Sequence, residues 1–266
     1  MDCACIYDDM ETKREIKADD IVEALRLYAD DEQRRVLMRF FKTAPGQYGE
    51  GDAFLGVRVP QTRGVVREAR RQVSLDEIER LLYSPLHEAR LAALLLLVEE
   101  MKAALPRRRA DPSTGAYRRE ELVRFYLRHA RQANNWDLVD LSCEYVLGTY
   151  LLHVGTDGRM PDRSVLDRLA ASDNLWEQRI AIVSTLELIR AGQFDDTLRI
   201  ATLLLDHPHD LIHKAVGWAL REVGKRDKDT LLAYLEANYA RMARTTLRYA
   251  IEKFPADERR EWLLRR

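Results

Sequence analysis

The sequence contains few of the residues that interrupt helices. Among 266 residues there are only 12 glycines and 8 prolines, while 46% of the residues are hydrophobic and 33% are charged. The chain is rich in Leu, Ala, Glu and Arg, which favour helix over sheet. No segment shows the alternation of apolar and polar residues that is typical of a strand. The length suits one large domain or two small ones and is ample for burying a core.

A long apolar run is also missing. The longest candidate, LAALLLLV at 91–98, lies between Arg90 and Glu99. It is far shorter than the run of about 18 residues that a transmembrane helix requires. The N-terminus carries acidic residues where a secretion signal needs basic and then apolar ones. We therefore expect a cytoplasmic protein that does not contact a membrane.

Cysteine is scarce, which argues against a disulfide framework. Cys3, Cys5 and Cys143 are an odd number in a chain without a secretion signal. Cys3 and Cys5 form an isolated C-x-C, and no His or further Cys completes a tetrahedral zinc set. A metal site there is the less favoured alternative to a mobile tail. We expect a flexible acidic segment at 1–20, a single helical domain at 21–266, and neither metal nor cofactor.

The net charge of -1 at first argues against a nucleic-acid partner, but the charge is unevenly distributed. Residues 1–20 hold seven acidic and three basic residues, so the rest of the chain carries +3. Bases concentrate at 105–131, with eight arginines against three acids, and at 241–266, with eight bases against four acids. Such clusters are usually solvated surface, yet a phosphate-binding groove requires them.

From residue 20 onward the apolar residues follow helical spacing. Residues 21–41 indicate two helices or one kinked helix, and TAPGQYGEGDAFLGV at 43–57 interrupts the pattern with a proline and four glycines. Pro60 suits the first turn of the next helix. Further helices are expected at about 75–83, 86–103, 119–132, 136–152, 162–171, 174–190, 195–206, 209–224, 228–239 and 243–254.

Three segments repeat one pattern at intervals of 34 to 35 residues. WEQRIAIVSTLEL, LIHKAVGWALREV and ARTTLRYAIEKF align with Arg179, Lys214 and Arg248 in register. Periods of this length built from helix pairs are typical of α-solenoids, whose second helices stack and line one concave surface. Bases near the starts of such helices can face a shared polyanion. Equally, they can cap neighbouring helices or pair with local acids.

The segment NNWDLVDLSCEYVLG combines a tryptophan with three acids. In a helix of about 100° per residue, Asp137, Asp140 and Glu144 gather on one side. Trp136 precedes Asp140 by one turn. A solvated face explains the acids but not the tryptophan. On this pattern alone, Trp136 and Asp140 are ordinary helix-boundary residues, and Trp176, which has no carboxylate four residues later, is interpreted as packing.

Four segments together resemble the AlkD family of bacterial DNA alkylation repair glycosylases: NNWDLVDLSCEYVLGTYLL, SDNLWEQRIAIVSTLELI, HKAVGWALREVGKRD and TTLRYAIEKFP. The resemblance begins at about residue 52, where FLGVRVPQTR is similar to the family's F-L-G-[VI]-x-x-P signature. It ends at about residue 255 and covers some three quarters of the chain. It implies an all-α, HEAT-like α-solenoid, a superhelix of antiparallel helix pairs that binds duplex DNA in its concave groove. It also implies the release of cationic alkylated purines such as 7-methylguanine and 3-methyladenine.

The resemblance implies a catalytic site as well. The family's catalytic centre is a W-D-x-V-D helix start, an arginine in W-x-Q-R and a tryptophan in G-W-x-L-R-E. The matching positions in this sequence are Trp136, Asp140, Arg179 and Trp218. Two positions depart from the family's pattern: Asn135 stands where a second tryptophan is common, and Phe40 stands where a tyrosine is frequent.

These residue types suit hydrolysis of the bond between a sugar and a cationic base. The alkyl group has already placed a positive charge on the base, so the leaving group needs no general acid. Asp140 is expected to stabilise the charge that develops on the sugar and to orient the water. Trp136 and Trp218 offer aromatic faces to the same charge, and Arg179 is expected to hold the phosphate beside the lesion. Further DNA contacts are expected from Lys214, Arg221 and Arg248.

No lysine or N-terminal amine stands out as a Schiff-base nucleophile, so we expect base removal without strand cleavage. Asp137 and Glu144 are expected to orient neighbouring groups or to raise the pKa of Asp140 by repulsion. The sequence thus predicts a monomeric, monofunctional DNA-alkylpurine glycosylase that acts on duplex DNA containing alkylated bases. The alternative is a non-catalytic solenoid that binds DNA structure or a protein partner. Asp140 favours the enzyme, because a carboxylate in a DNA groove costs affinity unless it takes part in chemistry.

Overall fold

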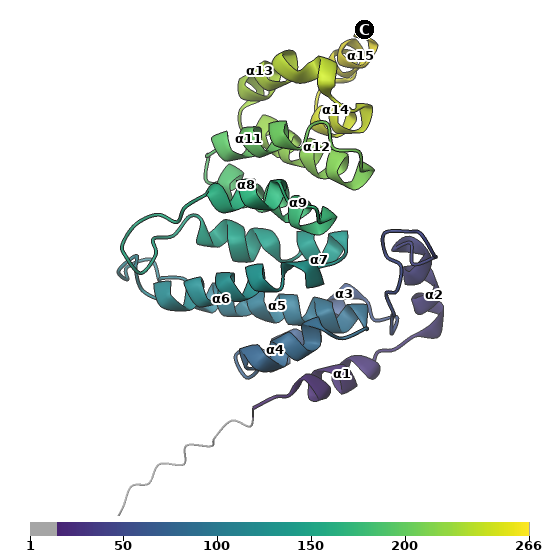
Figure 1. Ribbon diagram of the computed structural model, residues 1–266, viewed down its shortest axis with the longest axis vertical. Helices are drawn as coiled ribbons and strands as arrows, with labels where there is room; N and C mark the ends of the chain where they lie inside the picture. The colour runs from purple at the N-terminus through teal and green to yellow at the C-terminus, as the bar shows by residue number, and fades with distance from the viewer. Residues whose placement is uncertain (1–14, 266) are drawn as a thin grey trace, which may run out of the picture.

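Helices make up the described structure from end to end. The structure, a computed structural model, describes residues 15–265, and these contain no β-strand (Figure 1). None of the described helices is long and apolar enough to cross a membrane. The all-α class that the sequence predicts is confirmed. The α-helices are α1 (Ala18–Arg26), α2 (Asp31–Phe40), α3 (Val59–Ala69), α4 (Leu75–Leu82), α5 (His87–Ala103), α6 (Ala116–Arg128), α7 (Trp136–Asp140), α8 (Ser164–Ala170), α9 (Leu175–Val183), α10 (Thr185–Arg190), α11 (Asp195–Leu203), α12 (Asp210–Gly224), α13 (Lys228–Asn238), α14 (Arg244–Ala250) and α15 (Ala256–Leu264), with 3-10 helices η1 (Ala130–Gln132) and η3 (Tyr239–Arg241) and a π-helix η2 (Glu144–Gly148).

The C-terminal half is a stack of helix pairs. In Figure 1, α8, α11 and α13 form one layer of this stack, and α9, α12 and α14 form the other. Within the second layer, α12 packs against both α9 and α14. These three helices carry the repeated segments of the sequence, so the predicted α-solenoid with stacked second helices is confirmed. We call α9, α12 and α14 the inner layer, because they lie on the side of the stack that α2 also occupies (Figure 1).

The stack continues past the last predicted helix. The last helix predicted from the sequence ends at residue 254, directly before Pro255. In the structure Pro255 instead precedes a new helix, α15. Trp262 of α15 is buried, and its ring centre lies 6.0 Å from that of Tyr239. α15 therefore covers the last helix pair of the solenoid, as a terminal repeat must.

Helix α5 is the centre of the N-terminal half. Residues 87–98 are all buried, so this helix is surrounded on every side, as its continuous apolar sequence predicts. Helices α3, α4, α6 and α7 pack around it. The first turn of α5 therefore lies deep inside the protein and close to α7.

Two predicted helices are each divided in the structure. The helix expected at 136–152 is split into α7 and the π-helix η2, and the helix expected at 174–190 is split into α9 and α10 at Ser184. A Cβ atom on Gly148 would lie 2.4 Å from the carbonyl oxygen of Ser184. The two interruptions thus meet at a close backbone contact between helices. Contacts between repeats, which apolar spacing does not report, decide where these helices break.

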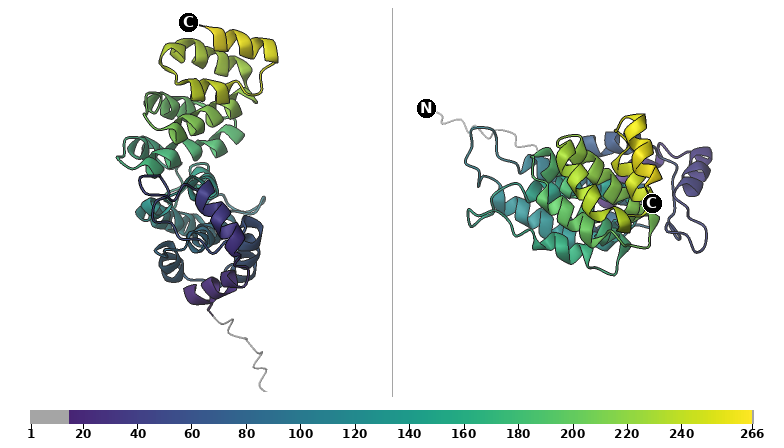
Figure 2. Two further views of the ribbon diagram at one scale, coloured as in Figure 1. Left: turned by 90° about the vertical axis from the view of Figure 1, so that its right-hand side faces the viewer. Right: turned by 90° about the horizontal axis from the view of Figure 1, so that it is seen from above.

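Helix α2 stands beside the stack rather than within it (Figure 2). None of its residues is buried. The chain returns from α2 through residues 41–57, where the rings of Phe41 and Phe54 stack with their centres 5.4 Å apart. We call α2 together with residues 41–57 the arm.

The predicted FLGV motif fixes the end of the arm. Gly56 has φ +89°, and a Cβ there would lie 2.0 Å from the carbonyl oxygen of Asp30, so no other residue fits. The buried carboxylate of Glu88 accepts the N–H groups of Leu55, Gly56 and Val57 at 2.8 to 3.1 Å. This contact attaches the arm to the first turn of α5. Pro60 lies in the first turn of α3, as the sequence predicts.

The N-terminal segment expected to be flexible lies only partly within the described residues. Residues 18–20 belong to α1, so the helical domain begins before residue 21. Its path is fixed by the N–H of Ile16, which donates to the carbonyl of Gln72 (2.9 Å). Residues 1–14, with Cys3 and Cys5, lie outside the described residues.

Candidate active site

Three acidic residues of α7 and η2 are each paired with a base from another helix. The exposed fractions of the Asp137, Asp140 and Glu144 side chains are only 7, 15 and 7%. A solvated acidic face, the simplest explanation of the sequence, is therefore excluded. The bases come from α5, α9 and α10, so the ion pairs also join the two halves of the molecule. The pairs are Asp137 with His87 (2.9 Å), Asp140 with Arg179 (2.8 Å) and Glu144 with Arg190 (2.8 Å).

The pair between Asp140 and Arg179 has bidentate geometry. Nε and Nη2 of Arg179 donate to the two carboxylate oxygens of Asp140, both at 2.8 Å. Nη1 donates to the carbonyl of Leu211 at 2.6 Å. Burial raises the pKa of Asp140, while the charge and hydrogen bonds of Arg179 act in the opposite direction. The nearby charges of Asp137 and Glu144 raise the pKa further, as the sequence analysis expected.

The position of Arg179 differs from the free phosphate ligand that the sequence predicts. Its side chain is only 6% exposed, and its guanidinium is directed at Asp140. Asn174 caps the start of α9, five residues before Arg179, and its side chain accepts the N–H groups of Trp176 and Glu177. This start places Arg179 opposite α7. Three of the five guanidinium N–H groups are used by Asp140 and Leu211, which leaves two for another acceptor.

Trp136 and Asp140 share a cavity of about 450 Å³ between the arm and helices α3, α5 and α7. Trp136 is half-buried, and its ring stacks on that of Phe41 at 5.4 Å between centres. Phe40 meets the same indole edge-on at 5.7 Å and is itself 59% exposed. The cavity therefore has aromatic walls and a carboxylate at one side.

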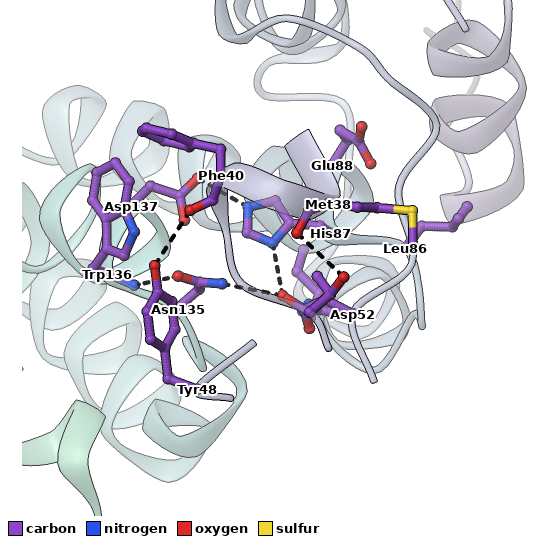
Figure 3. Close-up of polar contacts among 12 residues, drawn as sticks. Met38, Phe40, Tyr48, Asp52, Leu86, His87, Glu88, Asn135, Trp136 and Asp137 are labelled. Carbon is purple, nitrogen blue, oxygen red and sulfur yellow. Dashed lines mark hydrogen bonds and ion pairs between the residues drawn. The ribbon is translucent and has the colours of Figure 1, made fainter. Parts of the chain in front are cut away.

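A buried ionic network supports this cavity (Figure 3). The ring of His87 lies between two carboxylates, with Nδ1 3.0 Å from Asp52 and Nε2 2.9 Å from Asp137. Arg90 donates to the second oxygen of Asp52 at 2.6 Å. Burial alone lowers the pKa of His87, but the hydrogen bonds to Asp137 and Asp52 outweigh it and raise the pKa to about 9. At neutral pH His87 is therefore an imidazolium that donates to both acids.

Asn135 belongs to the same network. Its side-chain oxygen accepts the N–H of Trp136 (2.8 Å) at the start of α7. Its amide nitrogen donates to Asp52 at 3.2 Å. The fully buried side chain of Asn135 thus links Asp52 of the arm to the start of α7, where Trp136 lies.

Comparison with known proteins fits this fold and these motifs. The family model described as DNA alkylation repair enzyme matches residues 21–254. The chain belongs to this family. The protein is also similar in structure to a predicted DNA alkylation repair enzyme from Enterococcus faecalis, with a TM-score of 0.61 and 16% sequence identity, over 86% of this chain and 97% of that one. No curated protein matches the sequence. Family membership supports a role in DNA repair, with DNA as the partner.

The fourth residue that the sequence predicts for the site, Trp218, lies elsewhere. It is half-buried on α12 and lines a separate cavity of about 160 Å³ with Leu186, Arg190 and Glu222. The structure therefore brings together Trp136, Asp140 and Arg179 but does not place Trp218 at their cavity. Trp176 is buried, in agreement with its interpretation as packing.

The other predicted DNA contacts lie on the inner layer, and most are paired. Lys214 forms an ion pair with Asp210 at 2.8 Å. Arg221 pairs with Glu252 of the neighbouring helix pair. Arg248 is exposed and has no ion pair within residues 15–265. The interpretation in which these bases pair with local acids thus describes two of the three.

Part of the basic cluster at 105–131 is structural as well. Arg119 is fully buried and donates to four backbone carbonyls. Arg118 pairs with Glu100 and Glu121, and Arg131 pairs with Asp173. Part of the charge that suggested a phosphate-binding surface is therefore engaged within the fold.

No sequence motif singles out His87, Asp52, Phe41 or Phe54. The available signals were the HEAR start of α5 and the aromatic residues that flank the glycine-rich segment. Neither signal reveals a site, because the residues become neighbours only when the arm returns to α5 and α7.

Proposed function

We propose that the protein is a DNA repair glycosylase that hydrolyses the N-glycosidic bond of cationic alkylated purines, such as 7-methylguanine and 3-methyladenine, in duplex DNA. The observation that carries the proposal is the Asp140 carboxylate, only 15% exposed, held by Arg179 beside Trp136 at one cavity. A family whose described role is DNA alkylation repair supplies the context. The proposal includes no strand cleavage, since no amine is singled out as a covalent nucleophile.

The chemistry needs little acid catalysis. As the bond between C1′ and the base nitrogen breaks, its electron pair moves onto the cationic base, which leaves as a neutral molecule. Positive charge then develops on the sugar, and a water oxygen forms the new bond to C1′. A fixed carboxylate in a water-poor site stabilises such charge better than water does.

Asp140 is the residue proposed to stabilise this charge and to orient the water. Because burial raises its pKa, its carboxylate accepts a proton from the attacking water more readily than an ordinary aspartate. Arg179 is proposed as a positioning residue: two parallel hydrogen bonds fix both oxygens of Asp140 and keep it ionised. Its two remaining N–H groups are proposed to meet the phosphate beside the lesion.

The two tryptophans have different proposed roles. Trp136 lines the cavity with Asp140 and offers its indole to the developing cation. Trp218 is half-buried on an inner-layer helix and faces another cavity, so it is proposed to contact DNA next to the lesion. Arg248 is proposed as the strongest of the remaining phosphate contacts, because it has no competing acid within residues 15–265.

One observation favours a second candidate, a solenoid that binds DNA without catalysis. Asp140 is already neutralised by a bidentate arginine, and such buried pairs also serve a purely structural purpose. In that case the carboxylate would align helices α7 and α9 and do nothing else.

The deciding experiment is the release of free 7-methylguanine from methylated duplex DNA. We expect release by the wild type and a loss of about a hundredfold or more in Asp140→Asn, the magnitude typical for removal of a preorganised charge. Asp195→Asn, an exposed aspartate on α11, is the matched control and should release base normally. Salt-sensitive DNA binding without base release would establish the non-catalytic solenoid, and strand breaks that form together with base release would contradict the monofunctional reaction.

A further inference from the structure

A row of arginines lies on the side of the molecule that faces away from the arm. Arg107, Arg108 and Arg109 belong to the loop between α5 and α6, residues 104–115, which we call the far loop. All three are exposed, and none has an ion pair within residues 15–265. We propose that the far loop binds the phosphate backbone of a second duplex DNA segment while a first duplex occupies the inner layer. This binding site is additional to the proposed reaction and does not depend on it.

The far loop lies at the opposite end of α5 from the cavity. Helix α5 begins with His87, which lines the cavity, and runs for 17 residues before the loop starts. At 1.5 Å per residue, the helix separates the two places by roughly 25 Å. Figures 1 and 2 both show the far loop on the side opposite α2. A duplex that contacts the inner layer and the cavity therefore leaves the arginines of the far loop available.

Buried contacts fix the shape of the far loop. Arg119 of α6 is fully buried, and its guanidinium donates to three carbonyl groups of the loop. These belong to Ala104, Pro112 and Thr114, at 2.6 to 3.2 Å. Gly115 has φ +75°, and a Cβ there would lie 2.1 Å from the carbonyl oxygen of Ala104, so the two ends of the loop touch. A loop that is already ordered loses less conformational entropy when its side chains bind a partner.

A neighbouring loop extends the basic surface. The segment before α8 is fixed to α6, because Arg119 also donates to the carbonyl of Val154 at 3.0 Å. Glu120 accepts the N–H and the hydroxyl of Thr156 at 2.7 and 2.9 Å. Arg159 of this segment is exposed and has no ion pair in the described part of the chain. Two loops joined through one helix thus present four arginines without an acidic partner among the described residues.

The acid of the far loop does not pair with its arginines. The carboxylate of Asp111 accepts the N–H of Ser113 at 2.7 Å and also its hydroxyl hydrogen. These hydrogen bonds lower the pKa of Asp111. With three arginines and one acid, residues 104–115 carry a net charge of +2. The far loop therefore remains positive in a protein whose net charge is -1.

The composition of the far loop favours a phosphate backbone over a protein or a membrane. Residues 106–115 contain no aromatic side chain and no Leu, Ile, Val or Met. Protein interfaces depend on buried aromatic and apolar anchors, and membrane-surface segments insert apolar side chains into the lipid. Guanidinium groups instead bind phosphate oxygens through paired hydrogen bonds. Duplex DNA offers one phosphate charge per about 1.7 Å of its length, and the family of this chain has a role in DNA repair.

A second DNA site has a kinetic consequence. A protein that holds two duplexes at once can pass from one to the other without first becoming free in solution. Its release from one duplex is then accelerated by the presence of another. A protein with a single site shows no such acceleration, because the competing duplex binds only after release.

The test follows the transfer of the full-length protein between undamaged duplexes. A fluorescent duplex is bound first, and its release is measured by stopped flow at increasing concentrations of an unlabelled duplex. We expect the release rate from the wild type to rise several-fold with the competitor concentration. In the triple variant Arg107→Gln, Arg108→Gln and Arg109→Gln the rate should be independent of the competitor. Sedimentation should show two short duplexes per wild-type molecule and one per molecule of the variant.

A matched control removes three positive charges elsewhere on the surface. Arg128, Arg259 and Arg260 are exposed and have no ion pair within the described residues. The control variant with glutamine at these three positions should keep the dependence on competitor. All the substituted residues of both triple variants are exposed, so circular dichroism should show both variants folded. The salt dependence of second-duplex binding should also fall by about 0.9 in its log–log slope for each arginine removed from the far loop.

Several results would overturn the second site. These are a wild-type release rate that ignores the competitor, a dependence that survives in the far-loop variant, and a dependence that both triple variants lose. A far-loop variant with reduced affinity for the first duplex would place the loop against DNA at the inner layer. If the wild type, but not this variant, binds phosphatidylserine vesicles or polyglutamate more tightly than a second duplex, the partner is a membrane or an acidic protein. All these measurements use undamaged DNA, so the glycosylase proposal stands or falls separately, by the release of 7-methylguanine.

Discussion

At the scale of single residues, the most informative pair is Asp140 with Arg179. A buried carboxylate is stable as an anion only when its charge is matched and its oxygens are hydrogen-bonded. Arg179 does both, with two parallel bonds of 2.8 Å. The same arginine therefore decides whether Asp140 is an anion at the pH at which a repair enzyme works.

We predict that Arg179→Gln moves the acidic limb of the activity profile to higher pH. Burial already raises the pKa of Asp140, and Arg179 is the largest influence that lowers it. Its removal raises the pKa further. Because the carboxylate is the active form, activity then disappears at a higher pH as the solution is acidified. The measurement is the pH dependence of single-turnover base release.

A control variant and a stability measurement accompany this test. Arg248→Gln removes an exposed arginine of the same inner layer and should leave the acidic limb in place, although it weakens DNA binding. Circular dichroism should show that Arg179→Gln is folded but less stable, by about 3 to 5 kcal/mol, as is usual when one partner of a buried pair is lost. An unchanged acidic limb in a folded variant would mean that Arg179 does not control Asp140.

The sequence identifies these residues but not their contacts. The motif positions of Trp136, Asp140 and Arg179 are visible along the chain, and the structure brings them together. The bond between Asp140 and Arg179 joins residues 39 positions apart, so helical spacing carries no signal for it. For that reason Arg179 was expected at a phosphate rather than on a carboxylate.

At the scale of elements, the central feature is the attachment of the arm to α5 and α7. Asp52 from the arm, His87 from α5 and Asp137 from α7 meet in one buried row. His87 bridges both acids, so it holds three elements together only while it is protonated. Arg90 also pairs with Asp52.

We predict that the free energy of unfolding falls between pH 6.5 and about 9. The folded protein holds the His87 proton more tightly than the unfolded chain, because the pKa rises from 6.5 to about 9. The stabilisation is therefore complete below pH 6.5 and is lost as the pH rises through 9. Its size is about 3 kcal/mol. Urea unfolding at a series of pH values measures it.

The variant His87→Gln separates this residue from the other titrating groups. Burial lowers the pKa values of His207 and His209, so these residues titrate below the window. Burial raises the pKa of Cys143 well above its ordinary value, so this thiol contributes only at the upper edge of the window, where it ionises in the unfolded chain. The variant should be less stable at neutral pH and nearly flat across the window. A slope equal to that of the wild type would assign the pH dependence to other residues.

The elements show where sequence patterns stop being informative. Apolar spacing locates the helix pairs from α8 to α14, because each helix has one buried stripe. It misses the start of α15, which follows Pro255, and the breaks near Gly148 and Ser184, which depend on contact between repeats. The position of the arm was not predictable either. It depends on Gly56 and on the backbone bonds to Glu88, which only the folded chain assembles.

At the scale of the whole molecule, a DNA-binding family member with a net charge of -1 needs an explanation. Affinity for duplex DNA comes largely from basic side chains, which displace counterions from the phosphates. In this protein many bases of the two positive segments are paired with acids or donate to carbonyls. Only basic side chains without an acidic partner contribute fully to the affinity for DNA. We therefore expect binding that is weaker and less salt-dependent than the number of basic residues suggests.

The salt dependence of DNA binding should consequently differ among the basic residues of the inner layer, according to the acids with which they pair. Arg248→Gln should reduce the slope of log K against log salt by about 0.9, the value for one lost phosphate contact. Lys214→Gln should have a smaller effect, because Lys214 must first leave Asp210. Arg221→Gln should have the smallest effect, because its side chain is only 19% exposed and pairs with Glu252. The measurement is fluorescence anisotropy with an undamaged duplex over a series of salt concentrations.

The outer layer supplies the control for this ranking. Arg199 belongs to α11, in the layer that lies away from the arm (Figure 1), and it pairs with Asp167 and Asp196, so Arg199→Gln should not change the slope. If Arg248→Gln and Arg199→Gln act alike, DNA does not bind along the inner layer. The basic residues that recur in the inner layer would then serve only as contacts between helices. The regular placement of Arg179, Lys214 and Arg248 would follow from the stacking of the solenoid alone.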